Sequence, residues 1–360
     1  MRLFWIIHNN TANTARVIVE GLRGRGVQQF SSREDLLWLR PPSDDLMKRW
    51  KKEDIGHFPD SASFIPDLAT LNFWEELKGA KLEDRIIFTI NSGANHNAQQ
   101  ALDIIRSNDL FNRTVVLDED EGNIKWHGLQ ELYMKSRAVL TGLGDKVFYD
   151  LKALRPRVFF IGFNGVEDRY VQPVVAKDID VFFKSRVEGW LPHRKPFKDR
   201  LLEMDARKAI GNACIMPQFK ESDGDPYLKL VSGDRHHPEY YSYLARTRIF
   251  VYLNGSNPIG YQFWEACANR CCIVHQTPWR SAFYNGGSAN PQKFHWEHYS
   301  PPFVRGEDFH YFETPDDLEK VLLRLMADPA LVDATAKRCS SKAQEFTPFR
   351  QAEKFLEMIL

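Results

Sequence analysis

Two apolar runs that enclose a turn-rich loop and a short helical stretch constrain the fold of this chain most. Residues 248–253 (RIFVYL) and 271–275 (CCIVH) carry side chains typical of buried strands. Between them, residues 254–258 (NGSNP) favour a loop, and residues 261–268 have the length of a short helix. A strand, a loop, a helix and a second strand form half of a nucleotide-binding parallel sheet, in which ligands bind beyond the carboxyl ends of the strands.

The same alternation extends along the rest of the chain. Further strands are predicted at residues 3–7, 85–90, 114–117, 137–140, 157–161, 178–183 and 311–312. Residues 31–84 interrupt the pattern with many charges and with tryptophans that need burial, which predicts a helical insertion. The predicted fold class is α/β, with two doubly wound Rossmann-like domains and a cleft between them.

Length and a change in composition indicate the domains. A chain of 360 residues is too long for one ordinary core, so two domains are expected. The composition changes near residues 165–175. We therefore predict an N-terminal domain at 1–170, a C-terminal domain at 171–346, and a C-terminal helix at 347–360 that could pack back on the first domain.

Composition and missing motifs count against several classes of function. Lys and Arg together number 48, and Asp and Glu together also number 48, so no overall positive field draws the chain to nucleic acid. A local basic groove is still compatible with this neutral total. No apolar run reaches the length of a membrane span, and five cysteines without a CxxC pair favour a soluble, cytoplasmic protein with reduced thiols. GxGxxG, Walker, HExxH and GxSxG motifs are absent, so dinucleotide, P-loop, zincin and common hydrolase chemistry lack support.

Several polar residues near the ends of predicted strands are candidates for chemistry. His8, His96 and Asp118 each follow a strand of the first half. Asp118 is the best placed of the three for a general base, with a solvated turn as the alternative. Glu265, one turn inside the short helix, could reach a ribose hydroxyl or could form part of a solvated helix surface. The loop at 184–194 (KSRVEGWLPHR) is rich in basic side chains and could bind a diphosphate or simply be exposed.

A series of four stretches matches a known family in order and spacing. They are residues 159–173 (FFIGFNGVEDRYVQP), 178–187 (DIDVFFKSRV), 238–255 (PEYYSYLARTRIFVYLNG) and 262–274 (QFWEACANRCCIV). The series resembles the GT-B glycosyltransferases, nearest to the spore-maturation (CgeB-like) and group 1 types. The similarity covers roughly residues 155–350, and the N-terminal half matches only in its alternation of strands and helices.

The resemblance implies an acceptor-side first domain, a nucleotide-sugar-binding second domain and roles for individual residues. The implied nucleotide-sugar-binding residues are Arg186, Arg194, Gly260, Tyr261, Gln262 and Glu265. Among these, Glu265 occupies the position that contacts the ribose, and Arg186 and Arg194 are candidates to neutralise the departing diphosphate. Gln262 stands where the family has an arginine, and Asn257 where it has an acidic residue. These two departures are compatible with an altered donor or with lost activity.

The activity that the resemblance implies is metal-independent transfer of a hexosyl or pentosyl group from a nucleoside diphosphate sugar. A UDP-sugar is the first candidate for the donor, and a glycan, a glycoconjugate or a small molecule for the acceptor. Neither a cofactor nor a bound metal is expected. The base that deprotonates the acceptor would be Asp118, His8 or His96, in that order.

Three alternatives stay open. A GT-B enzyme that glycosylates modified bases in nucleic acid would use the basic stretch 48–52 (KRWKK) to bind phosphates. A catalytically inactive GT-B scaffold would account for the departures at Gln262 and Asn257. An epimerase-like enzyme would share the two-domain architecture but would need a carboxylate pair that the sequence does not reveal. The oligomeric state is not indicated.

Overall fold

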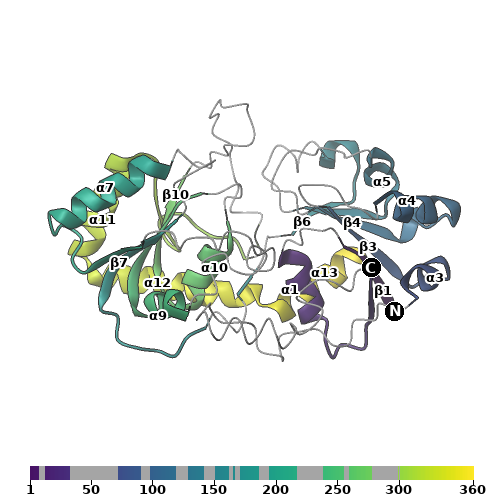
Figure 1. Ribbon diagram of the computed structural model, residues 1–360, viewed down its shortest axis with the longest axis horizontal. Coiled ribbons are helices and arrows are strands. Elements are labelled where there is room, and N and C mark those ends of the chain that lie inside the picture. The colour runs from purple at the N-terminus through teal and green to yellow at the C-terminus, as the bar shows by residue number, and fades with distance from the viewer. Residues whose placement is uncertain are drawn as a thin grey trace, which may run out of the picture.

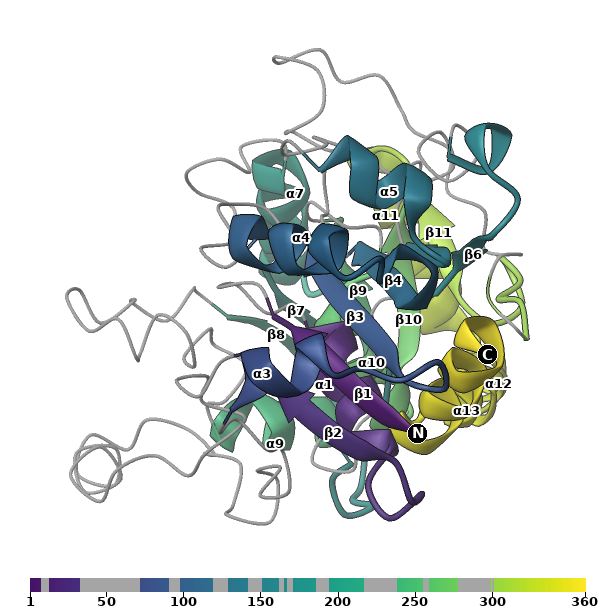
Figure 2. The same cartoon turned by 90° about the vertical axis from the view of Figure 1, so that its right-hand side faces the viewer.

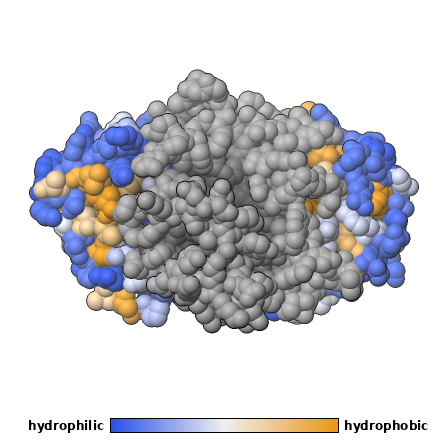
Figure 3. All heavy atoms as spheres, in the orientation of Figure 1, coloured by the Kyte–Doolittle hydropathy of each residue, from blue (hydrophilic) through white to orange (hydrophobic). Residues whose placement is uncertain are grey.

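Two parallel β-sheets, each covered by helices on both faces, form the molecule (Figure 1). The computed structural model describes residues 1–7, 13–32, 72–90, 98–118, 129–141, 151–161, 165–166, 171–185, 194–216, 238–254, 259–277, 299 and 301–360. The surface of the described residues is visible at the two ends of the molecule in Figure 3. There it is mainly hydrophilic, with smaller hydrophobic patches.

The first sheet has the strand order β2-β1-β3-β4-β5-β6, with every pair parallel. Its strands are β1 (Arg2–Ile6), β2 (Gln28–Ser31), β3 (Arg85–Ile90), β4 (Thr114–Asp118), β5 (Ala138–Thr141) and β6 (Val158–Phe160). The sequence did not predict β2, because QQFS is short and polar. Its Gln29 is nevertheless buried, accepting from Trp5 Nε1 at 3.0 Å and donating to the Val19 carbonyl at 3.2 Å.

Alternating side chains of β1 divide the core of the first sheet in two. Phe4 and Ile6 face the helices α3 (Phe73–Lys78), α4 (Ala98–Ser107) and α5 (Gln130–Lys135). Leu3 and Trp5 face α1 (Asn13–Gly21) and the terminal helix α13 (Pro348–Ile359). Of the predicted helical insertion, residues 33–71 lie outside the described residues.

The second sheet has the order β11-β10-β9-β7-β8 and is also parallel throughout. Its strands are β7 (Ile179–Lys184), β8 (Ala213–Met216), β9 (Thr247–Tyr252), β10 (Cys272–Gln276) and β11 (His310–Phe312). Its helices are α7 (Lys195–Ala206), α9 (Pro238–Arg246), α10 (Tyr261–Ala268), α11 (Pro315–Ala327) and α12 (Pro329–Ala343). The helices α9 and α10 cover one face and α7 and α11 the other, while α12 contributes to both clusters. The predicted α/β class with two doubly wound sheets is confirmed.

In the described part of the chain, one connection between the two sheets includes residues 165–166 and another includes Phe346, and the two connections touch. The Val166 amide donates to the Phe346 carbonyl at 3.0 Å, and a Cβ on Gly165 would lie 2.0 Å from the same oxygen. Beyond Phe346, α13 packs against α1 and lies near the N-terminus of the chain (Figures 1 and 2). Arg85 Nε and Arg137 Nε each donate to the Ile359 carbonyl at 2.9 Å, which fixes the end of α13 to the first sheet.

Candidate functional site

The strand order of the second sheet locates a candidate ligand site. The chain runs from β7 outward to β8 and then returns to β9 on the other side of β7, so successive connections leave this point in opposite directions. Ligands of doubly wound sheets bind at such a switch point, beyond the carboxyl ends of the strands. The candidate site therefore consists of the carboxyl ends of β7 and β9 and the start of α10.

A lysine at the end of β7 puts a buried positive charge at this switch point. Lys184 is 2% exposed, and its Nζ lies 4.2 Å from the ring centroid of Tyr240 in α9. An ammonium at that distance is attracted to the ring face. Gln262 Nε2, in the first turn of α10, donates to the Lys184 carbonyl at 3.1 Å. The start of α10 is thus held against the end of β7.

Arg194 supports the end of β9. Its Nε and Nη2 donate to the Asn254 carbonyl at 2.9 and 2.6 Å, and Nη2 also donates to the Leu253 carbonyl at 3.2 Å. Asn254 is 1% exposed, and its Nδ2 donates to the Gln276 carbonyl at 2.7 Å. Within the described part of the chain, Asn254 Oδ1 has no hydrogen-bond partner. A buried carbonyl oxygen that can still accept a hydrogen bond therefore lies at the edge of the switch point.

The residue before α10 is held by a tyrosine of β9. The Gly260 amide donates to the Tyr252 hydroxyl at 2.7 Å, and a Cβ at position 260 would come within 3.0 Å of the same oxygen. The Tyr252 ring in turn stacks on His275 of β10, with centroids 4.8 Å apart. Glycine therefore allows the close approach of backbone and hydroxyl. Tyr261 follows as the first residue of α10.

Glu265 points into the core between α9 and α10. It is 1% exposed and accepts from the Tyr240 hydroxyl at 2.7 Å and from the Tyr241 hydroxyl at 3.3 Å. Burial and the negative charge of Glu265 raise the pKa of Tyr240 well above its usual value, so this hydroxyl remains a proton donor. Tyr240 thereby connects Lys184 with Glu265. The predicted ribose contact of Glu265 stays a prediction.

Comparison with known proteins places this geometry among solved folds. No family model and no curated protein sequence matches the chain. HepE of Anabaena, in a crystal structure with UDP, is 11% identical with a TM-score of 0.58, over 100% of this chain and 99% of that one. Sucrose-phosphate synthase of Thermosynechococcus elongatus is 14% identical with a TM-score of 0.54, over 99% and 98% of the two chains. TarM is 8% identical with a TM-score of 0.55, over 99% and 98%.

All three of these proteins are GT-B glycosyltransferases. This chain has the GT-B fold. The likeness extends over both sheets, since nearly the whole chain is covered in each comparison. Sequence identities this low establish the architecture alone.

In this GT-B fold one of the predicted base candidates, Asp118, belongs to the first sheet. Asp118 ends β4, is 1% exposed, and accepts from the Tyr133 hydroxyl at 2.7 Å. The switch point of this sheet lies between β1 and β3, and β4 is the next strand beyond β3. His8, His96 and Arg186 lie outside the described residues. The roles of all four residues stay predictions.

The structure brings some predicted residues together and adds others. Gln262 and Glu265 meet around Tyr240 and Lys184, whereas Arg194 lies at the end of β9. Lys184 was noted in sequence only as part of a basic loop. Its position directly after an apolar run is the signal that could have marked it as a buried strand end.

Among the described residues, no group of three or more His, Cys, Asp and Glu side chains is arranged to hold a metal ion. In the same part of the chain, no helix is both long enough and apolar enough to cross a membrane.

Proposed function

We propose that this GT-B protein transfers a hexosyl or pentosyl group from a nucleoside diphosphate sugar to an acceptor. The observation that carries the proposal is the buried side chain of Lys184 at the carboxyl end of β7, at the β7–β9 switch point. A buried cation at such a switch point suits the diphosphate of a donor, and the start of α10, which Gln262 ties to the Lys184 carbonyl, adds backbone N–H groups. The crystal structure of HepE with UDP makes a UDP-sugar the first candidate.

The proposed reaction makes a defined demand on the protein. The bond between the anomeric carbon and the diphosphate oxygen breaks, and its electron pair stays on the diphosphate. The acceptor oxygen bonds to the anomeric carbon and loses its proton to a base. Lys184 stabilises the charge that develops on the leaving diphosphate, and Gln262 keeps α10 in place beside it.

Two residues would orient the nucleoside. Asn254 Oδ1 would accept from an N–H or O–H group of the nucleotide, because a buried acceptor without a partner is costly. Glu265 would bind a ribose hydroxyl in place of Tyr241, whose hydrogen bond of 3.3 Å is longer than that of Tyr240 at 2.7 Å. In this proposal Tyr240 stays in place and orients the carboxylate.

The remaining parts of the proposal concern the acceptor and the charge balance. We infer that basic side chains alone neutralise the diphosphate, so that transfer needs neither a metal nor another cofactor. Asp118 is the first candidate for the base, followed by His8 and His96. The acceptor would be a glycan, a glycoconjugate or a small molecule.

A ligand screen tests the proposal. The melting temperature would be measured with UDP, GDP, ADP and CMP and with the corresponding sugar donors, because a ligand of the folded state stabilises it by mass action. A nucleoside diphosphate at one hundred times its Kd would add about 2.7 kcal/mol to the free energy of unfolding. If no nucleotide or donor changes the melting temperature, the proposal is wrong.

Two further measurements separate the two GT-B alternatives. An inactive scaffold would bind a nucleotide but release no free nucleoside diphosphate from any donor, with or without an acceptor. An enzyme acting on bases in nucleic acid would also shift the mobility of DNA or RNA, with a steep salt dependence. The basic stretch 48–52 and Asn257, which suggested these alternatives, lie outside the described residues.

A further inference from the structure

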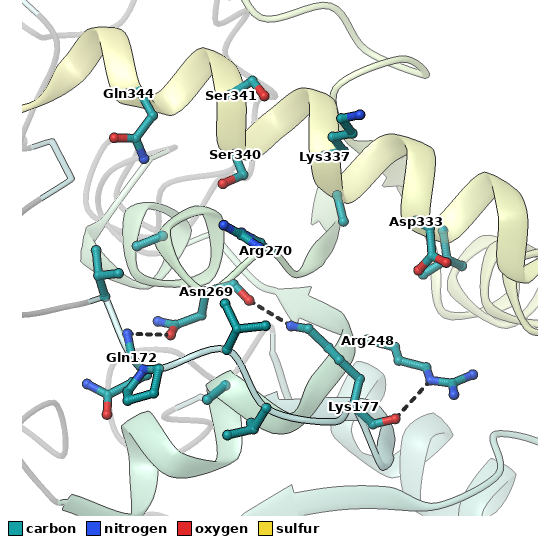
Figure 4. A pocket seen from close by; sticks show the side chains of 18 residues that line it. Gln172, Lys177, Arg248, Asn269, Arg270, Asp333, Lys337, Ser340, Ser341 and Gln344 are labelled. Carbon is teal, nitrogen blue, oxygen red and sulfur yellow. Dashed lines mark hydrogen bonds between the residues drawn. The ribbon is translucent and has the colours of Figure 1, made fainter.

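A cavity lies at the opposite end of the second sheet from Lys184. It has a volume of about 770 Å³ and lies between the extended segment 171–177 and α12 (Figure 4). Lys177, Arg248 and Arg270 line it at the amino ends of β7, β9 and β10. A cavity of this volume is large enough for a small-molecule ligand.

One side of the cavity is apolar. Val171, Pro173, Val174 and Val175 line it from the extended segment, and the three valines are exposed, with Val174 at 78%. Exposed valines in a row offer a surface on which an apolar group of a ligand can be buried.

The other side of the cavity is basic. Four basic residues and one acidic residue line the cavity, which leaves an excess of three positive charges. Lys177 Nζ is engaged by the Thr247 and Asn269 carbonyls, each at 2.6 Å. By contrast, neither Arg270 nor Lys337 makes a side-chain hydrogen bond or ion pair with any residue that the structure describes.

One hydroxyl lies on the same side of α12 as Arg270. Lys337, Ser340 and Ser341 of α12 and Gln344 just after it all line the cavity, but the ammonium of Lys337 and the hydroxyl of Ser341 point away from Arg270 (Figure 4). Figure 4 shows Ser340 on the side of α12 that faces Arg270. Cationic and hydroxyl donors together favour an anion with several acceptor oxygens over a neutral ligand.

The backbone of Arg270 is in an unfavourable conformation for an arginine. Its φ is 54°, and it follows α10 where the Cys271 amide donates to the Ala266 carbonyl at 3.0 Å. This left-handed position after a helix is one that glycine usually occupies. Lys208 has the same conformation after α7, with φ of 57°, but does not line this cavity. Lys208 therefore provides a matched control for the backbone.

We propose that this cavity binds a small organic phosphate monoester. The guanidinium of Arg270 and the hydroxyl of Ser340 bind the phosphate oxygens, and Lys337 adds positive charge at the border of the cavity. The organic part of the ligand lies against Val171, Val174 and Val175. This site is separate from the proposed nucleotide-sugar site, and its existence does not depend on that proposal.

Titration calorimetry with phenyl phosphate and inorganic phosphate tests the proposal. Arg270→Gly removes the guanidinium while relieving the backbone, so it should weaken phenyl phosphate binding about tenfold or more without destabilising the fold. Lys208→Gly relieves the same backbone conformation at α7 and should bind like the unmodified protein. Inorganic phosphate should bind more weakly than phenyl phosphate, because it leaves the valines uncovered.

Several results would contradict the proposed phosphate site. Absence of phenyl phosphate binding at millimolar concentration would do so, as would equal binding by Arg270→Gly and the unmodified protein. Loss of binding in Lys184→Met with retention in Arg270→Gly would place the phosphate at the switch point instead. Equal affinity for both phosphates would refute the contact with the valines.

Discussion

The hydroxyl of Tyr240 carries a residue-scale prediction, because it holds a buried carboxylate. Tyr240→Phe removes the 2.7 Å hydrogen bond to Glu265, and Tyr241→Phe removes the 3.3 Å one. A hydrogen bond to a charged group contributes more than one between neutral groups, so we expect Tyr240→Phe to lower the free energy of unfolding by about 2 kcal/mol. Tyr241→Phe should cost less. Urea unfolding measures both, and equal losses would contradict this account of Glu265.

At the scale of single residues, the sequence identified candidate residues but not the side chains that surround them. Glu265 was noted, but its burial depends on tyrosines 24 and 25 positions away. Asp118 likewise meets Tyr133 only after α5 has packed on the sheet. Such contacts are set by tertiary packing, and a periodic pattern within one element contains no information about them.

At the scale of elements, His310 makes the attachment of β11 to two helices dependent on pH. Its Nδ1 lies 3.0 Å from Arg324 Nη2, and its Nε2 lies 3.2 Å from Thr335 Oγ1. Burial, together with the positive charges of Arg324 and Arg338, lowers the pKa of His310 from 6.5 to about 4. The neutral imidazole is therefore the form that the folded protein favours.

The sign of the pH dependence follows from that lowered pKa. As the pH falls below 6.5, His310 takes up a proton in the unfolded chain before it does so in the folded protein. The contribution of neutral His310 to the free energy of unfolding is therefore complete above pH 6.5 and is lost progressively down to about pH 4. At pH 5 the loss should be about 2 kcal/mol relative to pH 7. Urea unfolding at both pH values would show a smaller loss for His310→Gln. An identical loss in the two proteins would contradict the assignment.

The contact between α1 and α13 depends on a glycine. A Cβ on Gly21 would lie 1.9 Å from the Pro348 carbonyl oxygen, so Gly21→Ala would push the two helices apart. We expect a loss of about 1–3 kcal/mol in the free energy of unfolding, as for other overpacked sites. At Gly79 the nearest atom to an added Cβ is 3.6 Å away, so Gly79→Ala serves as the control and should be nearly neutral. A similar effect of both variants on urea unfolding would count against the proposed close packing.

Whether an element could be predicted from the sequence depended on how apolar its segment is. Strands such as β3 (RIIFTI) and β9 (TRIFVY) were predicted because both of their faces are buried. The edge strand β2 was missed because its glutamines look like loop residues until Trp5 and Val19 are in place. Fully buried strands are therefore easier to predict from sequence than polar edge strands.

At the scale of the molecule, the sheet orders provide what the sequence could only suggest. The alternation of elements predicted two parallel sheets, but the positions of β7 and β9 as neighbours follow from the three-dimensional order. That order turns Lys184 from one member of a basic loop into the buried cation of a switch point. The proposed donor site therefore depends on the whole second sheet.

Calorimetric titration of UDP into the unmodified protein and into Lys184→Met tests the central proposal most directly. Lys320→Met, at a 76% exposed side chain of α11, is the matched control, and urea unfolding establishes that each variant is folded. We predict that UDP binds the unmodified protein and Lys320→Met equally, and that Lys184→Met weakens binding about tenfold or more because a charge-assisted contact is lost. Equal UDP affinity in Lys184→Met, or no UDP binding to the unmodified protein, would contradict the proposed donor site.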